Sequence, residues 1–240
     1  MKTLALFISA YKADKNLIDI IDIFYGQKLP RGWELRLYIG VDGCRDTYNL
    51  LKKNKINFYY SSNNVGTYVV ANSLIDKAKI SNPDMYARFD ADDIPRKNYL
   101  FPGIKKCQKL KFARAHYRWK NHPTNSGKEK ILAWGISFFD KEVLSKVGGY
   151  SEFRVSADHD FAMRLKNVGY EGDFRNIFYQ KFFKKALFTR VYNSSSLSAN
   201  KNTRHSSSYR NSVNQQLEKN RKLDNKIIPK VVHLEMIEGN

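Results

Sequence analysis

The first ninety residues alternate between short apolar runs and amphipathic segments, and this order restricts the fold more than any other feature of the sequence. Strand-like runs and segments of helical spacing follow one another in the order 4–10, 17–24, 34–41, 48–53, 56–60, 69–78 and 85–89. Strands that alternate with helices make right-handed crossovers, which build a mostly parallel sheet covered on both faces. The pattern therefore predicts an α/β fold whose ligands bind beyond the carboxyl ends of the strands.

The length and the cysteine content indicate a globular protein of a reducing compartment. The chain has 240 residues, of which 42% are hydrophobic, which suits one large domain or one domain with an arm. The apolar run at residues 1–10 is too short for a signal peptide or a membrane span. Cys44 and Cys107 have no metal-ligand spacing, and we expect two reduced thiols. These features predict a cytoplasmic protein without a transmembrane segment.

The formal net charge of +19 is the unusual global property of the chain. This net charge comes largely from two stretches with interleaved aromatics that have few acids to offset their basic residues: residues 96–130 contain Glu129 as their single acid, and residues 174–217 contain none. Such a charge opposes compact folding through self-repulsion, so it predicts an anionic partner. Nucleic acid, an anionic membrane surface and an acidic polymer all fit. A lysine-rich solvated surface without a partner is the alternative.

Three carboxylates follow the run at residues 85–89, in the sequence Asp90-Ala91-Asp92-Asp93. Negative charges this close repel one another, so a cation or a buried network has to offset them. Mg²⁺ and Mn²⁺ bind carboxylates together with phosphate oxygens, so the cluster predicts a metal bridge to a diphosphate. A solvated acidic turn is the alternative. Asp42 ends an earlier strand and is expected in the same crevice.

A second acidic pair, Asp158 and Asp160, precedes the helical segment at residues 161–168. A carboxylate can accept the proton of a sugar hydroxyl as that hydroxyl attacks an anomeric carbon, so either residue is a candidate general base. A metal and Lys or Arg side chains would stabilise the departing diphosphate. Capping of the helix by one of these acids is the alternative role.

Six segments, in this order and spacing, resemble the family 2 glycosyltransferases with the GT-A fold: LFISAYKADKNL, LYIGVDGCRDT, NNVGTYVVANSLIDKAK, MYARFDADDIPRKNYL, VLSKVGGY and SADHDFAMRL. The resemblance covers residues 4–170. It implies a Rossmann-like, mostly parallel sheet flanked by helices, with a basic C-terminal extension of helix and loop. It also implies three regions: a nucleotide-sugar-binding half at 1–95, an acceptor-binding and catalytic-base half of the same domain at 96–190, and a basic loop with a C-terminal tail at 191–240.

The resemblance assigns roles to the residues that match the family's motifs. It implies an inverting, metal-dependent transfer in which Asp158 is the catalytic base and Mn²⁺ or Mg²⁺ is the cofactor. The implied donor-binding residues are Ala10, Tyr11, Asp42, Asn64, Gly66, Arg88, Asp90, Asp92 and Asp93. The implied metal ligands are Asp90, Asp92 and His205. The implied acceptor-binding residues are Trp134, Asp160, Arg164 and Arg190.

The chain departs from the family at three points. Ala157 stands where the family has a glutamate beside the base. Tyr192 stands where members often have a metal-binding histidine, so His205 is the candidate substitute. The QxxRW motif of the processive polysaccharide synthases is absent, which argues against a processive, exporting enzyme.

Two acceptors remain open. DNA with a hydroxymethylated base, as modified by phage-encoded glycosyltransferases in the host cytoplasm, agrees with the charge and requires the base to be flipped or the duplex bent. A lipid-linked surface glycan such as lipopolysaccharide or capsule, met at the inner membrane face, agrees with the family's usual occupation. A nucleic-acid-binding protein without catalysis, whose carboxylates hold a structural cation, is the alternative from another class. The oligomeric state is left open.

Overall fold

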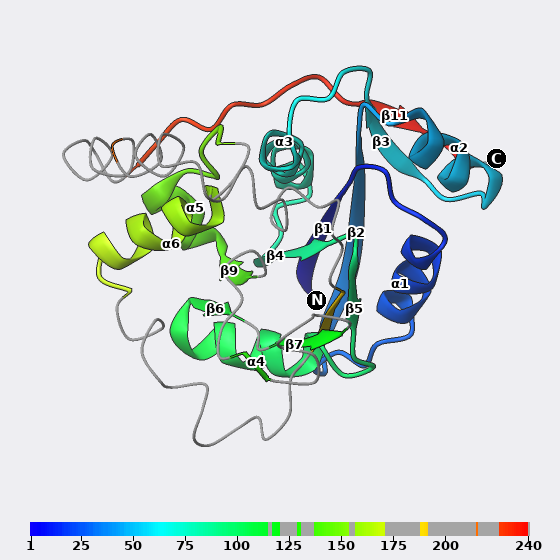
Figure 1. Ribbon diagram of the computed structural model, residues 1–240. Coiled ribbons are helices and arrows are strands. Elements are labelled where there is room, and N and C mark those ends of the chain that lie inside the picture. The colour runs from blue at the N-terminus through cyan, green and yellow to red at the C-terminus, as the bar shows by residue number, and fades with distance from the viewer. Residues whose placement is uncertain are drawn as a thin grey trace.

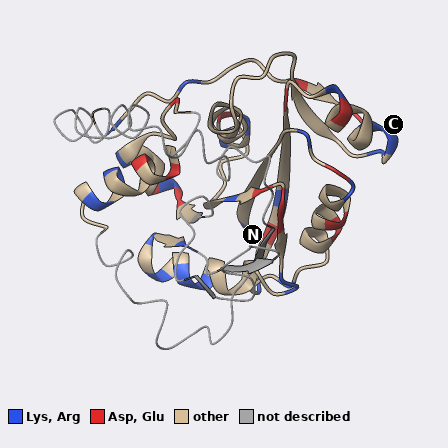
Figure 2. Cartoon of the chain, in the orientation of Figure 1, with Lys and Arg blue, Asp and Glu red and all other residues tan. Residues whose placement is uncertain are grey.

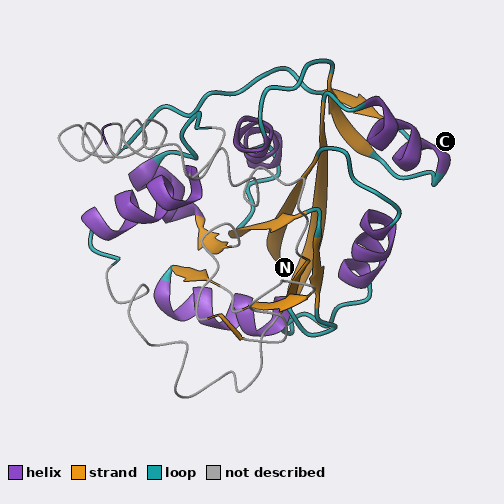
Figure 3. Cartoon of the chain, viewed as in Figure 1, coloured by secondary structure: helices purple, strands orange, loops and turns teal. Residues whose placement is uncertain are grey.

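The computed structural model describes residues 1–114, 117–120, 129–130, 137–153, 157–170, 188–191, 215 and 226–239. At residues 117–120, 129–130, 137 and 188–191 it describes the backbone alone. Helices lie on both faces of a central sheet, so the described part of the chain has three layers (Figure 1, Figure 3).

A seven-stranded sheet forms the centre of the fold, in the order β11-β3-β2-β1-β4-β9-β6. Its strands are β1 (Lys2–Ala10), β2 (Trp33–Asp42), β3 (Phe58–Ser61), β4 (Met85–Asp90), β6 (Phe112–Arg114), β9 (Ser137–Asp140) and β11 (Glu235–Ile237). The inner strands β3, β2, β1 and β4 run parallel, whereas β9, β6 and β11 pair antiparallel with their neighbours. A helix connects each inner strand to the next along the chain, as parallel pairing requires.

The central strand β1 shows why the sheet has an apolar core on each side. Successive residues of a strand point to opposite faces, and here Leu4, Leu6 and Ile8 belong to one buried cluster while Ala5 and Phe7 belong to the other. Helices α1, α2 and α4 fill the first cluster, and α3, α5 and α6 fill the second. The helices are α1 (Asn16–Tyr25), α2 (Arg45–Lys53), α3 (Thr67–Lys79), α4 (Leu100–Leu110), α5 (Lys141–Val147) and α6 (Ala157–Asn167).

A smaller sheet adjoins the carboxyl end of β4. Its four short strands follow the order β5-β10-β7-β8, with the bounds β5 (Asp93–Pro95), β7 (Tyr117–Lys120), β8 (Glu129–Lys130) and β10 (Phe188–Val191). Because β4 ends at Asp90 and β5 begins at Asp93, the acidic cluster is the link between the two sheets. Strand pairing on both sides therefore fixes the backbone of this turn.

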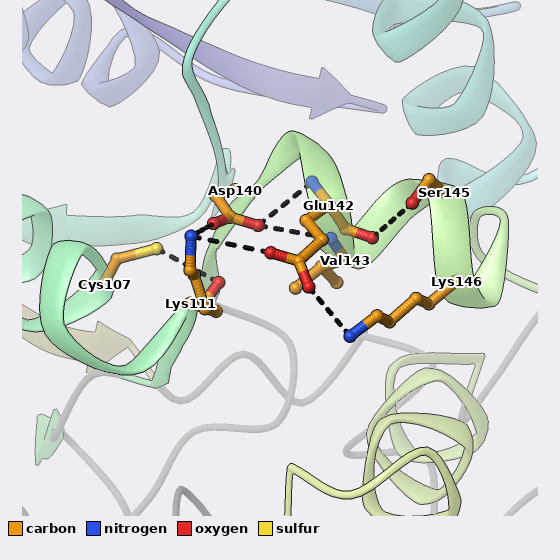
Figure 4. Close-up of polar contacts among 7 residues, drawn as sticks. All are labelled: Cys107, Lys111, Asp140, Glu142, Val143, Ser145 and Lys146. Atoms are coloured by element: carbon orange, nitrogen blue, oxygen red, sulfur yellow. Dashed lines mark hydrogen bonds and ion pairs between the residues drawn. The ribbon is translucent and has the colours of Figure 1, made fainter.

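A polar network joins the end of α4 to the start of α5 (Figure 4). Asp140 caps α5, because its Oδ1 accepts hydrogen bonds from the backbone N–H groups of Glu142 (3.0 Å) and Val143 (3.2 Å). Lys111 follows α4 with a left-handed φ of 69°, and its Nζ lies 3.0 Å from Asp140 and 3.5 Å from Glu142. Lys146 pairs with Glu142 at 2.8 Å. The network thereby sets the direction in which α5 leaves the sheet.

The segment at residues 226–239, here called the C-terminal strap, runs from α5 past α3 to β3 (red in Figure 1). The Ile227 N–H donates a hydrogen bond to the Val147 carbonyl (3.3 Å), and the Val232 N–H donates to Ser73 Oγ of α3 (2.8 Å). Near its end the strap forms β11, which pairs antiparallel with β3. The strap therefore connects three elements that are distant in sequence.

Asn72 of α3 is the hydrogen-bonding centre beneath the strap. Its Nδ2 donates to the carbonyls of Tyr150 (2.8 Å) and Lys230 (3.2 Å), and its Oδ1 accepts from the Tyr150 N–H (2.9 Å). The side chain is buried, and a Cβ at Gly149 would lie 2.5 Å from its Oδ1. Backbone can be buried against a helix when its polar groups are paired, so Asn72 lets Tyr150 and the strap pack against α3.

The structure confirms the predicted α/β fold and the strand–helix alternation of the first ninety residues. The bounds differ by at most three residues, at the start of α2. The helical segment predicted at 161–168 belongs to α6, which begins earlier, at Ala157. The sequence pattern does not indicate α4 or β11, and β11 makes part of the predicted tail integral to the main sheet.

Two further findings concern the cysteines and the membrane. Cys44 and Cys107 are free thiols, and both are buried. Across the described residues, every helix is too short or too polar to cross a bilayer. Most of the C-terminal extension of helix and loop that the resemblance implies lies outside the described residues.

We predict that Asn72→Ala lowers the free energy of unfolding by about 1–3 kcal/mol, because it removes the partner of the buried backbone groups of Tyr150 and of the part-buried Lys230 carbonyl. Urea denaturation followed by circular dichroism measures the change. The matched control is Asn54→Ala, which removes one exposed hydrogen bond to the Leu50 carbonyl and should change stability by less than about 0.5 kcal/mol. Equal losses in the two variants would contradict the role assigned to Asn72.

Candidate active site

Three predicted donor residues lie at the carboxyl edge of the parallel strands. Ala10 ends β1, Asp42 ends β2 and Asp90 ends β4. β1 lies between the other two strands, with Ala10 opposite Val41 and Ser9 opposite Asp90. The three strand ends are therefore adjacent, at the edge where parallel sheets bind their ligands.

Asp42 organises the turn that leads into α3. Its buried carboxylate accepts hydrogen bonds from the backbone N–H groups of Val65 (2.7 Å) and Gly66 (3.0 Å). Gly66 has a φ of 101°, which a residue with a side chain rarely adopts. The turn also packs tightly against β2, because a Cβ at Gly43 would lie 2.3 Å from the Asn64 backbone nitrogen. The structure thus brings Asp42, Asn64 and Gly66 together, with the Asp42 carboxylate holding the turn.

Ala10 and Tyr11 differ sharply in exposure. Ala10 is fully buried at the end of β1, whereas 48% of the Tyr11 surface is exposed. The Lys12 ammonium lies 5.4 Å from the centre of the Tyr11 ring. An exposed ring at the end of a central strand can stack on a nucleobase. The small side chain of Ala10 would let a ligand approach the backbone closely.

The three aspartates of the acidic turn have different surroundings. Asp92 is exposed, 17% of the Asp90 side chain is exposed, and Asp93 is fully buried. Asp93 lies near Tyr99: burial, and then the charges of Asp93 and Asp90, raise the pKa of the Tyr99 hydroxyl well above its usual value. Asp90 and Asp92 therefore line the exposed side of the turn, and Asp93 lies on its interior side.

Arg88 is buried behind the acidic turn, in contrast to the donor-binding place predicted for it. It is 3% exposed, and its Nη2 lies 2.5 Å from Asp90 Oδ1. Its guanidinium carbon lies 4.8 Å from the ring centre of Tyr68 and 5.8 Å from that of Tyr150. Burial lowers the pKa of Arg88, but Asp90, both tyrosines and Asp158 raise it to a net value above the usual one. The guanidinium therefore stays charged and supports Asp90 from the interior.

Asp158, the predicted base, lies in the first turn of α6 and approaches the same tyrosines. Its carboxylate lies close to the Tyr68 hydroxyl, and burial followed by the charge of this carboxylate raises the pKa of Tyr68 well above its usual value. The charge of Asp158 also acts on Arg88 and Tyr150. Asp158 itself is half-buried, and its Oδ1 accepts the His159 N–H at 2.9 Å. The structure thus brings the predicted base and the acidic turn around one buried guanidinium.

Asp160 and Arg164 form a buried ion pair on α6. Arg164 Nε lies 3.0 Å from Asp160 Oδ2, and the two side chains are 2% and 0% exposed. Arg164 also donates hydrogen bonds to the carbonyls of Val147 and Gly149. The pair holds α6 to the end of α5, and its burial differs from the acceptor-facing place that the sequence predicts for both residues.

Three predicted residues lie at the limits of the described chain. Trp134 and His205, predicted to bind the acceptor and the metal, are outside the described residues, as is Tyr192. Arg190 lies in β10, where the backbone alone is described. Its register opposite Asp93 of β5 places β10 beside the acidic turn.

The oxygen donors of the acidic turn fit a divalent cation that a ligand helps to hold. Asp90 and Asp92 supply two carboxylates at the exposed side of the turn. Within the described residues, the His, Cys, Asp and Glu side chains form no group of three or more suited to a metal. Mg²⁺ and Mn²⁺ take one or two carboxylates and complete their coordination with phosphate oxygens and water. The turn therefore offers the protein's share of a site that a diphosphate would complete.

Sequence reasoning did not single out three tyrosines of the site. Tyr68, Tyr99 and Tyr150 are at most 8% exposed, and each lies beside a charged group of the site. Tyr68 and Tyr150 each follow a glycine turn, which was the available signal. Aromatic residues beside turns are common in cores, so this signal does not separate a site residue from a packing residue.

Sequence comparison identifies one curated relative of the chain. No protein-family profile matches. The cellulose synthase catalytic subunit (UDP-forming) of Pseudomonas fluorescens (strain SBW25) is 24% identical over 200 residues, which cover 70% of this chain and 26% of that protein. The chain thus spans about a quarter of the length of this relative.

Several solved structures share the fold. S. aureus TarS matches with a TM-score of 0.55 and 15% identity, over 81% of this chain and 37% of that chain. TarS 1–349 in complex with UDP-GlcNAc has a TM-score of 0.58 and 13% identity, over 82% and 60% of the two chains. The mannosyltransferase PcManGT from Pyrobaculum calidifontis, in complex with GDP-Man and Mn²⁺, has a TM-score of 0.51 and 14% identity, over 70% and 52%. The chain therefore has the GT-A fold and resembles family 2 glycosyltransferases, as the sequence motifs predict.

Proposed function

We propose that this chain is a glycosyltransferase that moves a sugar from a nucleotide-sugar donor to a hydroxyl group of an acceptor, with inversion at the anomeric carbon. The observation that carries the proposal is the convergence of two sets of carboxylates: Asp90 and Asp92 at the end of β4, and Asp158 at the start of α6. Similarity to proteins described with UDP, UDP-GlcNAc and GDP-Man supports a nucleotide-sugar donor.

The donor would lie along the carboxyl edge of the sheet. The exposed ring of Tyr11 suits stacking on the base, and the turn held by Asp42 borders the same edge. The diphosphate then reaches the exposed side of the acidic turn, where Asp90 and Asp92 lie. Buried Asp93 contributes by fixing the turn at the start of β5.

Asp90 and Asp92 would hold Mn²⁺ or Mg²⁺ together with the diphosphate. When bound, the ion supplies a positive charge that neutralises the diphosphate as it leaves. The complex of the neighbouring PcManGT with GDP-Man and Mn²⁺ supports this cofactor. Two carboxylates alone repel a diphosphate, so the arrangement of this turn makes binding of the donor depend on the cation.

Asp158 would act as the general base. The acceptor hydroxyl forms a new bond to the anomeric carbon as its proton passes to the Asp158 carboxylate, and the bond between that carbon and the diphosphate breaks with its electron pair. A half-buried carboxylate that faces the site from α6 suits this role. The adjacent hydroxyl of Tyr68 would orient this carboxylate.

For the acceptor we propose an anionic polymer, first of all DNA with a hydroxymethylated base. Lys105 and Lys109 are exposed on α4, near the exposed ring of Phe101, and Figure 2 shows basic residues along this helix. The helix begins directly after Tyr99, which lies near Asp93 of the acidic turn. The basic face therefore starts beside the site, where an acceptor carrying phosphates would dock.

We predict that Asp158→Asn lowers the rate of sugar transfer by about 100-fold to 10,000-fold, because the amide cannot accept the hydroxyl proton. Donor affinity stays within about twofold of wild type, since Asp158 is not a donor ligand in this proposal. Isothermal titration with the nucleoside diphosphate and steady-state kinetics separate the two effects. A large loss of donor affinity would show that Asp158 is structural.

We predict that Asp92→Asn abolishes turnover that depends on Mn²⁺ or Mg²⁺, because it removes an exposed ligand and one negative charge. Release of nucleoside diphosphate from UDP-, GDP-, CMP- and dTDP-sugars measures it. The control is Asp76→Asn on the exposed face of α3, which should keep full activity. Full activity of Asp92→Asn would remove the metal hypothesis, and an inactive wild type with every donor would favour a non-catalytic binding protein.

We predict that duplex DNA binds with an affinity that falls steeply with salt, because Lys side chains displace counterions from the phosphates. Titration over a range of NaCl concentrations measures the slope, and Lys105→Glu/Lys109→Glu should flatten it. The control Lys52→Glu/Lys53→Glu changes two exposed lysines of α2 and should leave the slope nearly unchanged. Selective binding to vesicles with anionic lipid, without binding to DNA, would instead favour a lipid-linked glycan.

A further inference from the structure

The buried guanidinium of Arg88 lies between the two sets of carboxylates that the proposed reaction uses. Its Nη2 contacts Asp90 Oδ1 at 2.5 Å. Its guanidinium carbon also lies 4.8 Å from the ring centre of Tyr68 and 5.8 Å from that of Tyr150. A planar guanidinium can donate in its plane and stack on aromatic rings at the same time, whereas an ammonium cannot do both.

Tyr68 extends this arrangement to the predicted base. It lies in the first turn of α3 and is 8% exposed. Its ring contacts Arg88, and its hydroxyl lies close to the Asp158 carboxylate. The start of α3 is itself held by Asp42, which accepts the N–H groups of the preceding turn. Tyr68 therefore contacts the guanidinium and lies beside Asp158.

The ring of Tyr150 lies beside that of Tyr68 and also contacts Arg88. Its ring centre lies 5.5 Å from that of Tyr68 and 4.8 Å from that of Phe161 on α6. Both backbone polar groups of Tyr150 are bound by Asn72 of α3. Elements α3, β4 and α6 are thus joined around one buried cation, and none of the three can shift without changing its contacts.

The positive charge of Arg88 compensates the repulsion between two carboxylates of the site. Asp90 and Asp158 carry like charges and converge on the same region, so they repel one another unless a positive charge compensates them. Arg88 is 3% exposed, and a charge removed from water is stabilised by such partners. The same group therefore fixes the place of the carboxylate assigned to the leaving group and, through Tyr68, of the carboxylate assigned to proton transfer.

We propose that Arg88 is a positioning residue that couples the two halves of the site: it holds Asp90 directly and holds Asp158 through Tyr68, with Tyr150 closing the contact. The proposal rests on the proposed glycosyl transfer and adds the group that keeps its two carboxylates at a fixed separation. Arg88 itself acts through these neighbours, because its burial keeps it from the donor.

The test combines two conservative substitutions with one control. Tyr68→Phe keeps the ring against Arg88 and removes the hydroxyl next to Asp158. Arg88→Lys keeps the charge and removes the stacked, planar contact. Tyr59→Phe removes a hydroxyl from another tyrosine that packs against the same apolar cluster, outside the site, and serves as the control.

Tyr68→Phe should lower kcat for sugar transfer about 10-fold to 100-fold and leave the dissociation constant of the nucleoside diphosphate with Mn²⁺ within about twofold. Arg88→Lys should lower kcat and also weaken binding of that diphosphate, because it releases Asp90 as well. Tyr59→Phe should match wild type in both. A purely structural role would lower the melting temperature without this division between kcat and binding, and wild-type kinetics in folded Tyr68→Phe would overturn the proposal.

Crystal structures of the same variants separate this proposal from the proposed function. The Asp158 carboxylate should turn away from its wild-type place in Tyr68→Phe, and both Asp90 and Asp158 should move in Arg88→Lys. If wild type releases no nucleoside diphosphate from any donor, the proposed function fails, and the positions of the two carboxylates still decide the role of Arg88. If neither carboxylate moves in either variant, the positioning role proposed for Arg88 is wrong.

Discussion

The concentration of negative charge at the end of β4 is the constraint on which the rest of the site depends. Asp90, Asp92 and Asp93 follow one strand, and Asp158 approaches from α6. Such a cluster is stable only with compensation, and Arg88 supplies a buried positive charge that contacts Asp90 at 2.5 Å. Asp93 is buried, Asp90 is paired with Arg88 and Asp92 is exposed. The same acidic turn can therefore stabilise the fold and bind a ligand.

The elements around this charge are held by backbone contacts from distant parts of the chain. Asn72 of α3 binds the backbone of Tyr150, and Arg164 of α6 binds the carbonyls just before it. The C-terminal strap then crosses α3 and pairs with β3. Through Asn72, the strap is thereby linked to Tyr150, whose ring contacts Arg88. Mutations far from the acidic turn are therefore expected to act on it through α3.

Local patterns predicted the parallel core because its strands are apolar and its turns contain glycine, proline and aspartate. Local sequence patterns did not predict β11, because a three-residue edge strand is defined by pairing with its partner β3 and not by its own sequence. For the site, charge and strand position indicated Asp42, Asp90, Asp92 and Asp158. Burial could not be deduced, so Arg88, Asp160 and Arg164 were expected to face ligands, whereas the structure places them in the interior.

The central claim is that Asp90 and Asp92 hold a divalent cation against the diphosphate of a donor. Crystals grown with UDP and Mn²⁺, measured near the manganese absorption edge, test it most directly. If Asp90 and Asp92 hold the cation, an anomalous peak should lie between the Asp92 carboxylate and the diphosphate oxygens, with Asp90 still paired to Arg88 behind it. A peak elsewhere, or a bound diphosphate with no ion beside Asp92, would contradict a metal site at Asp90 and Asp92.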